Sequence, residues 1–138
     1  MSYATIDEVA ALSAGRTFTA TSKPTATQVG IFMRQCFAEL NGIVAERGYT
    51  VPVATSATTS FQLLAAYNAM GAHCLVEKSA PTNRGDAAKE ACEAWAAAKK
   101  ALATGGVELP DASEAETGSS AVRAGYQATA MFTPTTAF

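Results

Sequence analysis

The single histidine, His73, carries the side chain best suited to proton transfer near neutral pH. A catalytic histidine needs a nucleophile or an acid within hydrogen-bond reach, and the sequence supplies no obvious candidate. Cys74 beside it could form only a fragment of a metal site, because no C-x2-C or H-x3-H spacing occurs. The residue types therefore predict no catalytic residue, no metal site and no cofactor, and we interpret His73 as a partly buried or surface histidine.

The remaining polar clusters have simpler explanations than chemistry. Lys89 and Glu93 are four residues apart and can form a surface ion pair on one helix. The glycines at 105–106 and 118 lack the G-x-x-x-x-G-K pattern of a phosphate-binding loop. Residues 84–86 spell an adhesion tripeptide, but Gly and Asp are also typical of a turn that enters a helix. We expect no enzymatic activity.

The three cysteines, Cys36, Cys74 and Cys92, are odd in number and widely spaced. This pattern is typical of a reducing compartment and predicts no disulfide framework. Each cysteine falls on an apolar helical stripe, where it would pack as a small buried side chain.

Apolar residues at three- and four-residue steps predict a chain dominated by helices. Thr5 and Thr25 are expected N-caps, because Glu8 and Gln28 follow three residues later and complete capping boxes. Gly48 occupies the position after a helix that favours positive φ. The predicted helices cover residues 6–13, 26–47, 59–78 and 87–104.

The inner face of the last predicted helix consists mainly of alanine, with Trp95 as its one large side chain. Small residues allow close helix approach, and short linkers favour antiparallel neighbours. The predicted fold class is all-α, a small bundle of about four helices with an extended, strand-like C-terminal tail. We expect residues 1–109 to form the helical domain and residues 110–138 to form the tail, with a flexible spacer at 111–120.

The tail alternates between apolar and polar or small residues from position 122 to 132. Such alternation is typical of a strand with one apolar face, and a lone strand needs an edge to pair with. We therefore expect the tail to dock on another molecule by strand addition, although its Ala, Thr and Ser content is also compatible with disorder. The candidate partner-interface residues of the tail are Val122, Tyr126, Met131, Phe132 and Phe138.

A second candidate surface is the loop at positions 49–53. Pro52 and its β-branched neighbours favour an extended backbone there and disfavour a helix. Two interpretations remain open: its side chains cover the end of the bundle, or they contact a partner. The candidate interface residues of this loop are Tyr49, Val51, Pro52 and Val53.

The composition limits the possible classes of function. Of 138 residues 49% are hydrophobic and only 16% are charged, against about 25% in average proteins. A chain this poor in charge is expected to cover part of its surface in an oligomer. The net charge of -2 and the absence of a polybasic cluster argue against a nucleic-acid-binding footprint. Apolar runs are far shorter than a membrane span, and the N-terminus lacks signal-peptide blocks, so we expect no membrane association.

Several segments of the chain form a recognisable pattern of helix lengths and loop sequences. They are Tyr3-Ala-Thr-Ile-Asp-Glu-Val-Ala-Ala-Leu12, Gly15-Arg-Thr-Phe-Thr19, Pro24-Thr25, Asn41-Gly-Ile-Val-Ala-Glu-Arg-Gly-Tyr-Thr-Val-Pro-Val53 and Asn83-Arg-Gly-Asp86. In these segments the chain resembles the head-to-tail connector (adaptor, or head-completion) proteins of tailed bacteriophages. The resemblance covers residues 3 to about 111 and does not reach residues 112–138.

This resemblance implies a structural protein of the virion neck, made in the host cytoplasm. Such adaptors form a ring, usually twelve-fold, beneath the portal protein and dock the stopper or tail-completion protein. DNA passes through the lumen of the ring without sequence-specific binding, and a terminal extension reaches the portal or neighbouring subunits. The alternative is a cytosolic helical regulatory module with a partner-binding C-terminal tail, and a small helical enzyme is a third and weaker option.

Overall fold

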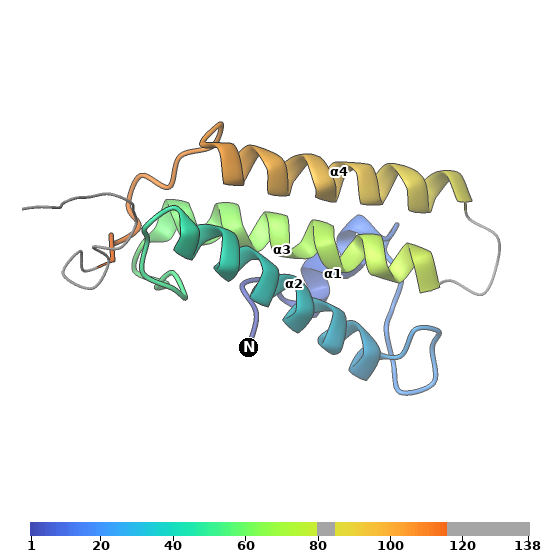
Figure 1. Cartoon of the computed structure of the whole chain (residues 1–138). Coiled ribbons are helices and arrows are strands. Elements are labelled where there is room, and N and C mark those ends of the chain that lie inside the picture. Colours follow the sequence, from blue (N-terminus) through green and yellow to red (C-terminus); the bar gives the residue numbers. More distant parts are fainter. Residues whose placement is uncertain (80–84, 116–138) are drawn as a thin grey trace, which may run out of the picture.

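A computed structural model of the chain describes residues 1–79 and 85–115, and over these ranges it is all-α with no strand (Figure 1). The predicted all-α bundle of about four helices is therefore confirmed, whereas the strand-like part of the predicted tail lies outside the described residues. Each predicted helix is present with ends within two residues of the expected ones. The helices are α1 (Ile6–Leu12), α2 (Ala26–Glu46), α3 (Thr58–Ser79) and α4 (Gly85–Thr104).

The helix ends follow the predicted capping chemistry. Thr25 and Gln28 form a complete capping box at the start of α2, with each side chain bonded to the other's backbone N–H. The Thr5 hydroxyl accepts the Glu8 N–H, but the Glu8 carboxylate bonds the Thr5 hydroxyl instead of the Thr5 backbone. Gly48 follows the C-cap of α2 with φ 91°, which favours glycine because that region is strained for L side chains.

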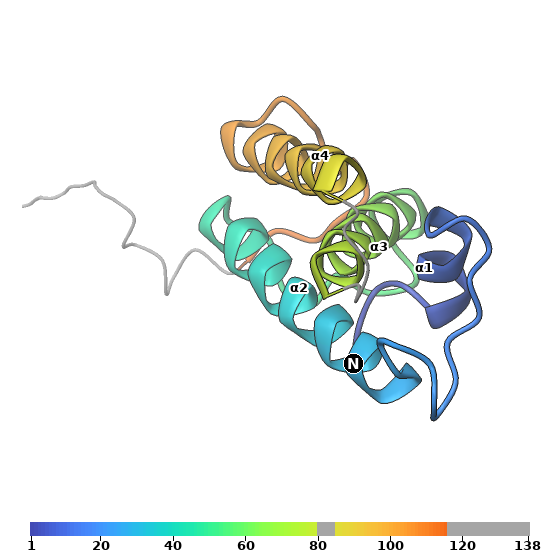
Figure 2. The same ribbon diagram turned by 90° about the vertical axis from the view of Figure 1, so that its right-hand side faces the viewer.

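Helix α3 is the centre of the molecule, because α1, α2 and α4 all pack against it (Figure 2). It is therefore buried on more than one face and carries three buried polar residues, Ser60, Asn68 and Glu77. Helices α2 and α4 each bury a single stripe. That stripe is Val29, Met33, Cys36, Leu40 and Val44 in α2, and Ala91, Trp95, Ala98 and Leu102 in α4.

Helices α2, α3 and α4 approach one another closely around Gly71. Gly71 of α3 faces Cys36 of α2 and Trp95 of α4, and an added Cβ at this glycine would lie 2.6 Å from the Cys36 sulfur and 2.9 Å from the Trp95 ring. Glycine at this position thus permits the indole of Trp95, which is 6% exposed, to enter between the helices. The expected role of Trp95 as the large wedge of α4 is confirmed.

The cysteines do not follow the sequence prediction. Cys74 of α3 and Cys92 of α4 form a disulfide across the interface of the two helices, and Cys36 is the free, buried thiol. The prediction of three reduced cysteines is wrong. It relied on cysteine number and spacing, whereas the antiparallel packing of α3 on α4 brings two residues 18 apart in sequence to a Cα–Cα distance of 4.7 Å.

Candidate functional site

The candidate interface loop closes one end of the bundle, between α2 and α3. Val53 is 4% exposed, and Tyr49 and Val51 are half-buried against the same core cluster, whereas Pro52 is exposed. The guanidinium of Arg47 lies 5.5 Å from the centre of the Tyr49 ring. The loop therefore covers the bundle end through its alternate residues and leaves Pro52 on the surface. Its contact with a partner stays a prediction.

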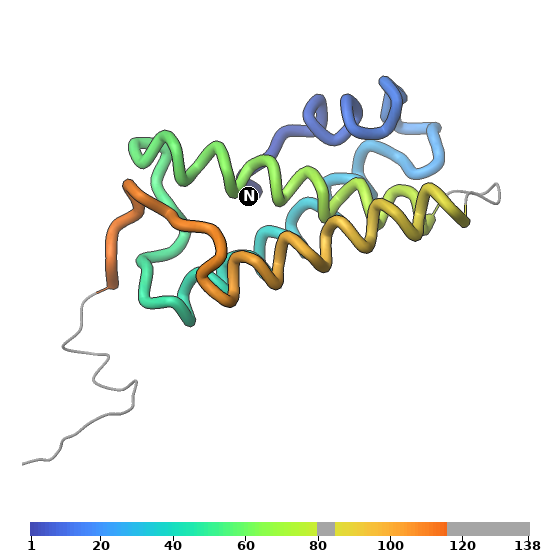
Figure 3. Tube along the Cα trace, turned by 90° about the horizontal axis from the view of Figure 1, so that it is seen from above, coloured from blue at the N-terminus to red at the C-terminus, as the bar shows by residue number. Residues whose placement is uncertain are grey.

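The base of the tail returns to this same end of the bundle (Figure 3). Residues 113–115 run antiparallel to residues 48–50, with Tyr49 and Glu114 as an isolated bridge. The Thr50 N–H donates to the Ser113 carbonyl at 2.8 Å, and the Ala115 N–H donates to the Gly48 carbonyl at 2.7 Å. The structure thus places the last described residues of the chain directly beside the candidate interface loop.

Asp111 fixes the tail base to the start of α3. Its carboxylate accepts the backbone N–H groups of Thr59 and Ser60, both at 2.9 Å, so it acts as the N-cap of a helix that begins 53 residues earlier at Thr58. A hydrogen bond with the Ser60 side chain, and after it the bonds from the backbone N–H groups of Ser60 and Thr59, hold the pKa of the Asp111 carboxyl below its usual value. The prediction of a flexible spacer is therefore wrong for residues 111–115, and residues 116–120 lie outside the described ranges.

The residues expected to anchor the tail, Val122, Tyr126, Met131, Phe132 and Phe138, also lie outside the described residues. Their docking by strand addition stays a prediction. What the structure adds is the point from which they depart, which is Ala115 at the loop end of the bundle.

Tyr3 supports the candidate loop from the N-terminal side. Its hydroxyl accepts the Val53 N–H at 2.9 Å and donates to Asn41 of α2, and its ring contacts Phe37 and Phe61 with centroid distances of 4.8 and 5.3 Å. Burial raises the pKa of the Tyr3 phenol, and the Val53 hydrogen bond opposes that rise. The position of the loop therefore depends on a residue 50 positions away, which no local sequence pattern indicated.

The side chain of Asn68 in α3 holds the N-terminal segment at Tyr3 and Ala4 in place. Asn68 of α3 is fully buried, and its side-chain oxygen accepts the N–H groups of Tyr3 at 2.7 Å and Ala4 at 3.2 Å. Its amide nitrogen donates to the Met33 carbonyl of α2 at 3.0 Å. All three bonds satisfy polar groups in the interior, so Asn68 joins the N-terminus, α2 and α3.

His73 belongs to a second polar cluster, between α3 and the segment that follows α1. Its Nδ1 lies 3.0 Å from the Ser13 hydroxyl and 3.9 Å from the Glu77 carboxylate, and Glu77 also lies 3.8 Å from Arg16. A pocket of about 370 Å³ adjoins the cluster. Sequence reasoning missed this grouping, because Ser13 and Arg16 come from another part of the chain.

The geometry of this cluster differs from that of a Ser–His–acid triad. In a triad the two ring nitrogens of histidine face different partners, whereas here the same Nδ1 faces both Ser13 and Glu77. The Ser13 hydroxyl also donates to the Val9 carbonyl at 2.9 Å and is 1% exposed. The cluster is better suited to joining α1 to α3 than to nucleophilic chemistry.

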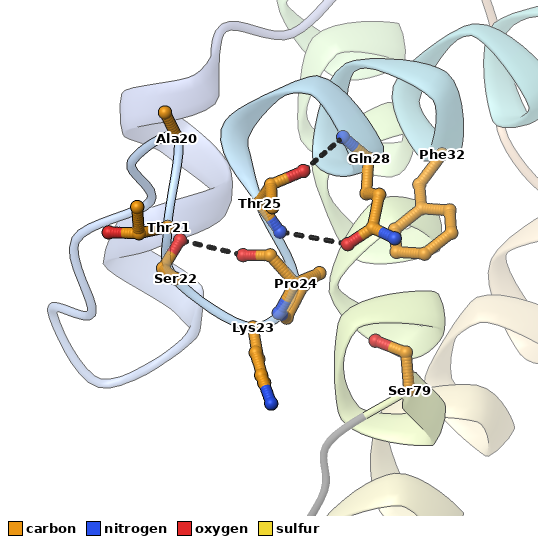
Figure 4. A pocket seen from close by; sticks show the side chains of 9 residues that line it. All are labelled: Ala20, Thr21, Ser22, Lys23, Pro24, Thr25, Gln28, Phe32 and Ser79. Atoms are coloured by element: carbon orange, nitrogen blue, oxygen red, sulfur yellow. Dashed lines mark hydrogen bonds between the residues drawn. The ribbon is translucent and has the colours of Figure 1, made fainter.

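A hollow of about 600 Å³ lies between the 20–25 loop, the start of α2 and the end of α3 (Figure 4). Among the described residues that line it, Lys23 is the one with a charge. Thr25 and Gln28 bond each other, and the Ser22 hydroxyl donates to the Pro24 carbonyl at 2.8 Å. Because these polar groups are already used within the wall, we assign no ligand to this hollow.

The described residues were also compared with the requirements of a metal site and of a membrane-spanning helix. No group of three or more His, Cys, Asp or Glu side chains in residues 1–79 and 85–115 is placed to hold a metal ion. No helix among them is both long and apolar enough to cross a membrane.

Comparisons of the chain with family models, with curated proteins and with solved structures find no match. The residues and the geometry of the loop end are therefore the basis for a functional proposal.

Proposed function

We propose that the chain is the structural head-to-tail adaptor of a tailed bacteriophage. Copies would form a ring, of about twelve, beneath the portal protein, extend the DNA channel and dock the stopper or tail-completion protein. The observation that carries the proposal is that the 49–53 loop and the tail base meet at one end of the bundle. One end of each subunit thus carries the candidate loop and the point from which the tail departs, so contacts of both with one partner ring would be concentrated there.

The surface composition supports assembly. A closed ring is built from heterologous contacts, in which one face of a subunit meets a different face of the next. Such contacts remove apolar area from water, and the described surface exposes Met1, Leu12 and Ile31 with 81%, 46% and 38% of their area accessible. With only 16% charged residues, the chain is suited to covering its sides with copies of itself.

The charge distribution suits a channel through which DNA slides. Tight binding to phosphates needs clusters of Lys and Arg that release counterions. Several of the few basic side chains are engaged within the bundle: Arg47 donates to the Leu102 and Val107 carbonyls, and Lys99 pairs with Glu39 at 3.2 Å. A lumen built from this chain would therefore hold DNA weakly and without sequence preference.

Deletion of residues 121–138 tests the role of the tail. We expect the truncated chain to fold, because the described bundle ends at Ala115, and to fail in assembly when it replaces the intact chain in the phage. A control variant with Gln127→Ser and Thr129→Ser changes only the polar face of the tail and should assemble normally. Full assembly of infectious particles by the truncated chain would show that the tail does not dock.

A further inference from the structure

An apolar groove of about 390 Å³ lies between the N-terminus and the 53–55 backbone, beside the candidate interface loop. The half-buried rings of Phe37 and Phe61 lie against the ring of Tyr3 at its base. We call this the aromatic groove. It is lined by Met1, Ser2, Tyr3, Phe37, Pro52, Val53, Ala54, Thr55 and Phe61.

The aromatic groove is preformed in the single chain. Its base cannot tilt freely, because the Tyr3 hydroxyl is bonded to Val53 and Asn41 and the Tyr3 N–H is bonded to Asn68. A preformed apolar pocket with few polar groups favours an apolar or aromatic side chain, since ordering costs on the protein side are small. Every side chain that lines it is uncharged, so the occupant should also carry no charged side chain near its anchor.

The tail of this chain has that chemistry. Residues 124–138 contain no Asp, Glu, Lys or Arg. Phe132 ends the alternating stretch, and small apolar residues, Ala128 and Ala130, precede it on the same face. Phe132 suits the groove better than Tyr126, because a buried tyrosine hydroxyl needs a hydrogen-bond partner and the hydroxyl of Tyr3 is already bonded to two groups.

The direction of the chain at Ala115 favours a second copy as the source of the tail. Residues 113, 114 and 115 pair in order with residues 50, 49 and 48, so the chain leaves toward the end of α2. The aromatic groove begins on the other side of Thr50, at Pro52. A tail that continued in this direction would move away from the groove of its own subunit, and an extended chain of 17 residues from Ala115 to Phe132 can reach about 55 Å.

We propose that the aromatic groove binds Phe132 of a second copy of this chain, an inference that deepens the proposed adaptor function and rests on it. Each subunit would give its tail to one neighbour and receive the tail of another, which is the heterologous arrangement that closes into a ring. Phe132 would be the anchor, flanked by Ala130 and Pro134, and its aromatic ring would supply most of the binding energy of the contact.

Photo-crosslinking of the purified full chain tests which copy is contacted. Phe132 is replaced with p-benzoylphenylalanine, and concentrated protein is irradiated. The proposal predicts a product of twice the chain mass, with cross-linked peptides that contain residues 52–61. Cross-linked peptides that join position 132 to residues 52–61 in protein of single-chain mass would show that the tail occupies its own groove, and cross-links to other surfaces would show that the groove is not the receptor. Either result overturns the proposal.

A complementation experiment with two full-length variants gives an independent test. Ala54→Trp fills the groove from its exposed rim, and Phe132→Ser removes the anchor. Each variant alone should self-associate at least about tenfold more weakly than the parent, whereas their mixture should form pairs, because one chain keeps its groove and the other keeps its anchor. Ser56→Trp, on an exposed neighbour that does not line the groove, is the matched control and should associate like the parent. Equal association of all variants would contradict the proposal.

The two proposals fail in different ways. If the chain is abundant in phage necks but Phe132 never cross-links to the groove of a second copy, the adaptor function survives and the groove assignment is wrong. If copies cross-link as predicted but the chain is absent from particles, the groove assignment survives and the adaptor function is wrong.

Discussion

The Asp111 carboxylate accepts the backbone N–H of Ser60 at 2.9 Å, and the Ser60 hydroxyl accepts the backbone N–H of Asp111 at 3.4 Å. This reciprocal pair joins residues that are 51 positions apart. The two hydrogen bonds follow the reciprocal pattern of a capping box, but the capping residue comes from the segment after α4 and not from the residue before α3. The start of α3 and the base of the tail are therefore stabilised by the same bonds.

Asp111→Ala should loosen both ends of this contact. The Thr59 and Ser60 N–H groups lose their acceptor, so their hydrogen exchange should become faster, and so should that of Ala115 in the paired segment. Asp111→Asn keeps one acceptor oxygen and should show a smaller change. Unchanged exchange at Thr59 and Ser60 in the alanine variant would mean that Asp111 does not cap the helix.

Acid should have the same effect as the alanine variant. The pKa of Asp111 is lowered in the folded state, so its contribution to stability is complete above the ordinary aspartate pKa of about 4 and is lost as the pH falls through the lower, folded value. Exchange at the Ser60 amide, corrected for intrinsic rates, should therefore rise on acidification in the parent and not in Asp111→Asn. An equal rise in both chains would exclude Asp111 as the titrating group.

Asn68→Ala should destabilise the fold strongly. The variant leaves the Tyr3 and Ala4 N–H groups and the Met33 carbonyl without partners in the interior and removes buried volume. We expect a loss of about 3–5 kcal/mol in the free energy of unfolding, measured by denaturant titration. Gln62→Ala, on the exposed side of α3, is the control and should change stability by less than about 0.5 kcal/mol. A loss below 1 kcal/mol at Asn68 would contradict the network.

Two glycines give a matched pair with opposite expected signs. Gly71→Ala places a methyl group against Cys36 and Trp95 and should destabilise the chain by about 1–3 kcal/mol. Gly42→Ala on α2 meets no atom within 4 Å and should stabilise it by about 0.5–1 kcal/mol, because alanine favours the helix. Thermal unfolding of both variants checks the packing of α2, α3 and α4. Equal shifts of the same sign would contradict it.

The disulfide predicts a definite thiol count. Unreduced, denatured protein should react with one equivalent of an alkylating reagent, at Cys36, and reduced protein with three. In the native protein Cys36 should react very slowly, because burial, with a smaller contribution from Glu39, raises the pKa of its thiol to about 12 against an opposing effect of Lys99. Reduction should cost about 3 kcal/mol of stability. Three reactive thiols without reductant would show that the bond is absent.

The helices were predictable because their signals are local. The apolar stripes of α2 and α4, the Thr25 capping box and the glycine at position 48 lie within a few residues of what they determine. Trp95 also follows from the spacing of its own helix, since it is the large side chain on a face of alanines.

The features that sequence reasoning missed all depend on distant residues. Asp111 caps α3, Tyr3 holds Val53, and Cys74 meets Cys92 only once α4 has packed on α3. A polar residue such as Asn68 gives no hint in the sequence that it is buried, because its partners are backbone groups of other segments. The contacts of Asp111 and Tyr3 shape the loop end, so the arrangement of the candidate interface could be described only from the structure.

The proposed adaptor function is tested most directly by counting copies of this chain in purified particles. Particles from the native source are separated on a density gradient, and the chain is quantified by mass spectrometry against the portal protein. The adaptor function predicts about a dozen copies per portal ring, located in the neck. Absence of the chain from particles, with all of it in the soluble fraction, would contradict that function and favour a regulatory module whose tail binds another partner.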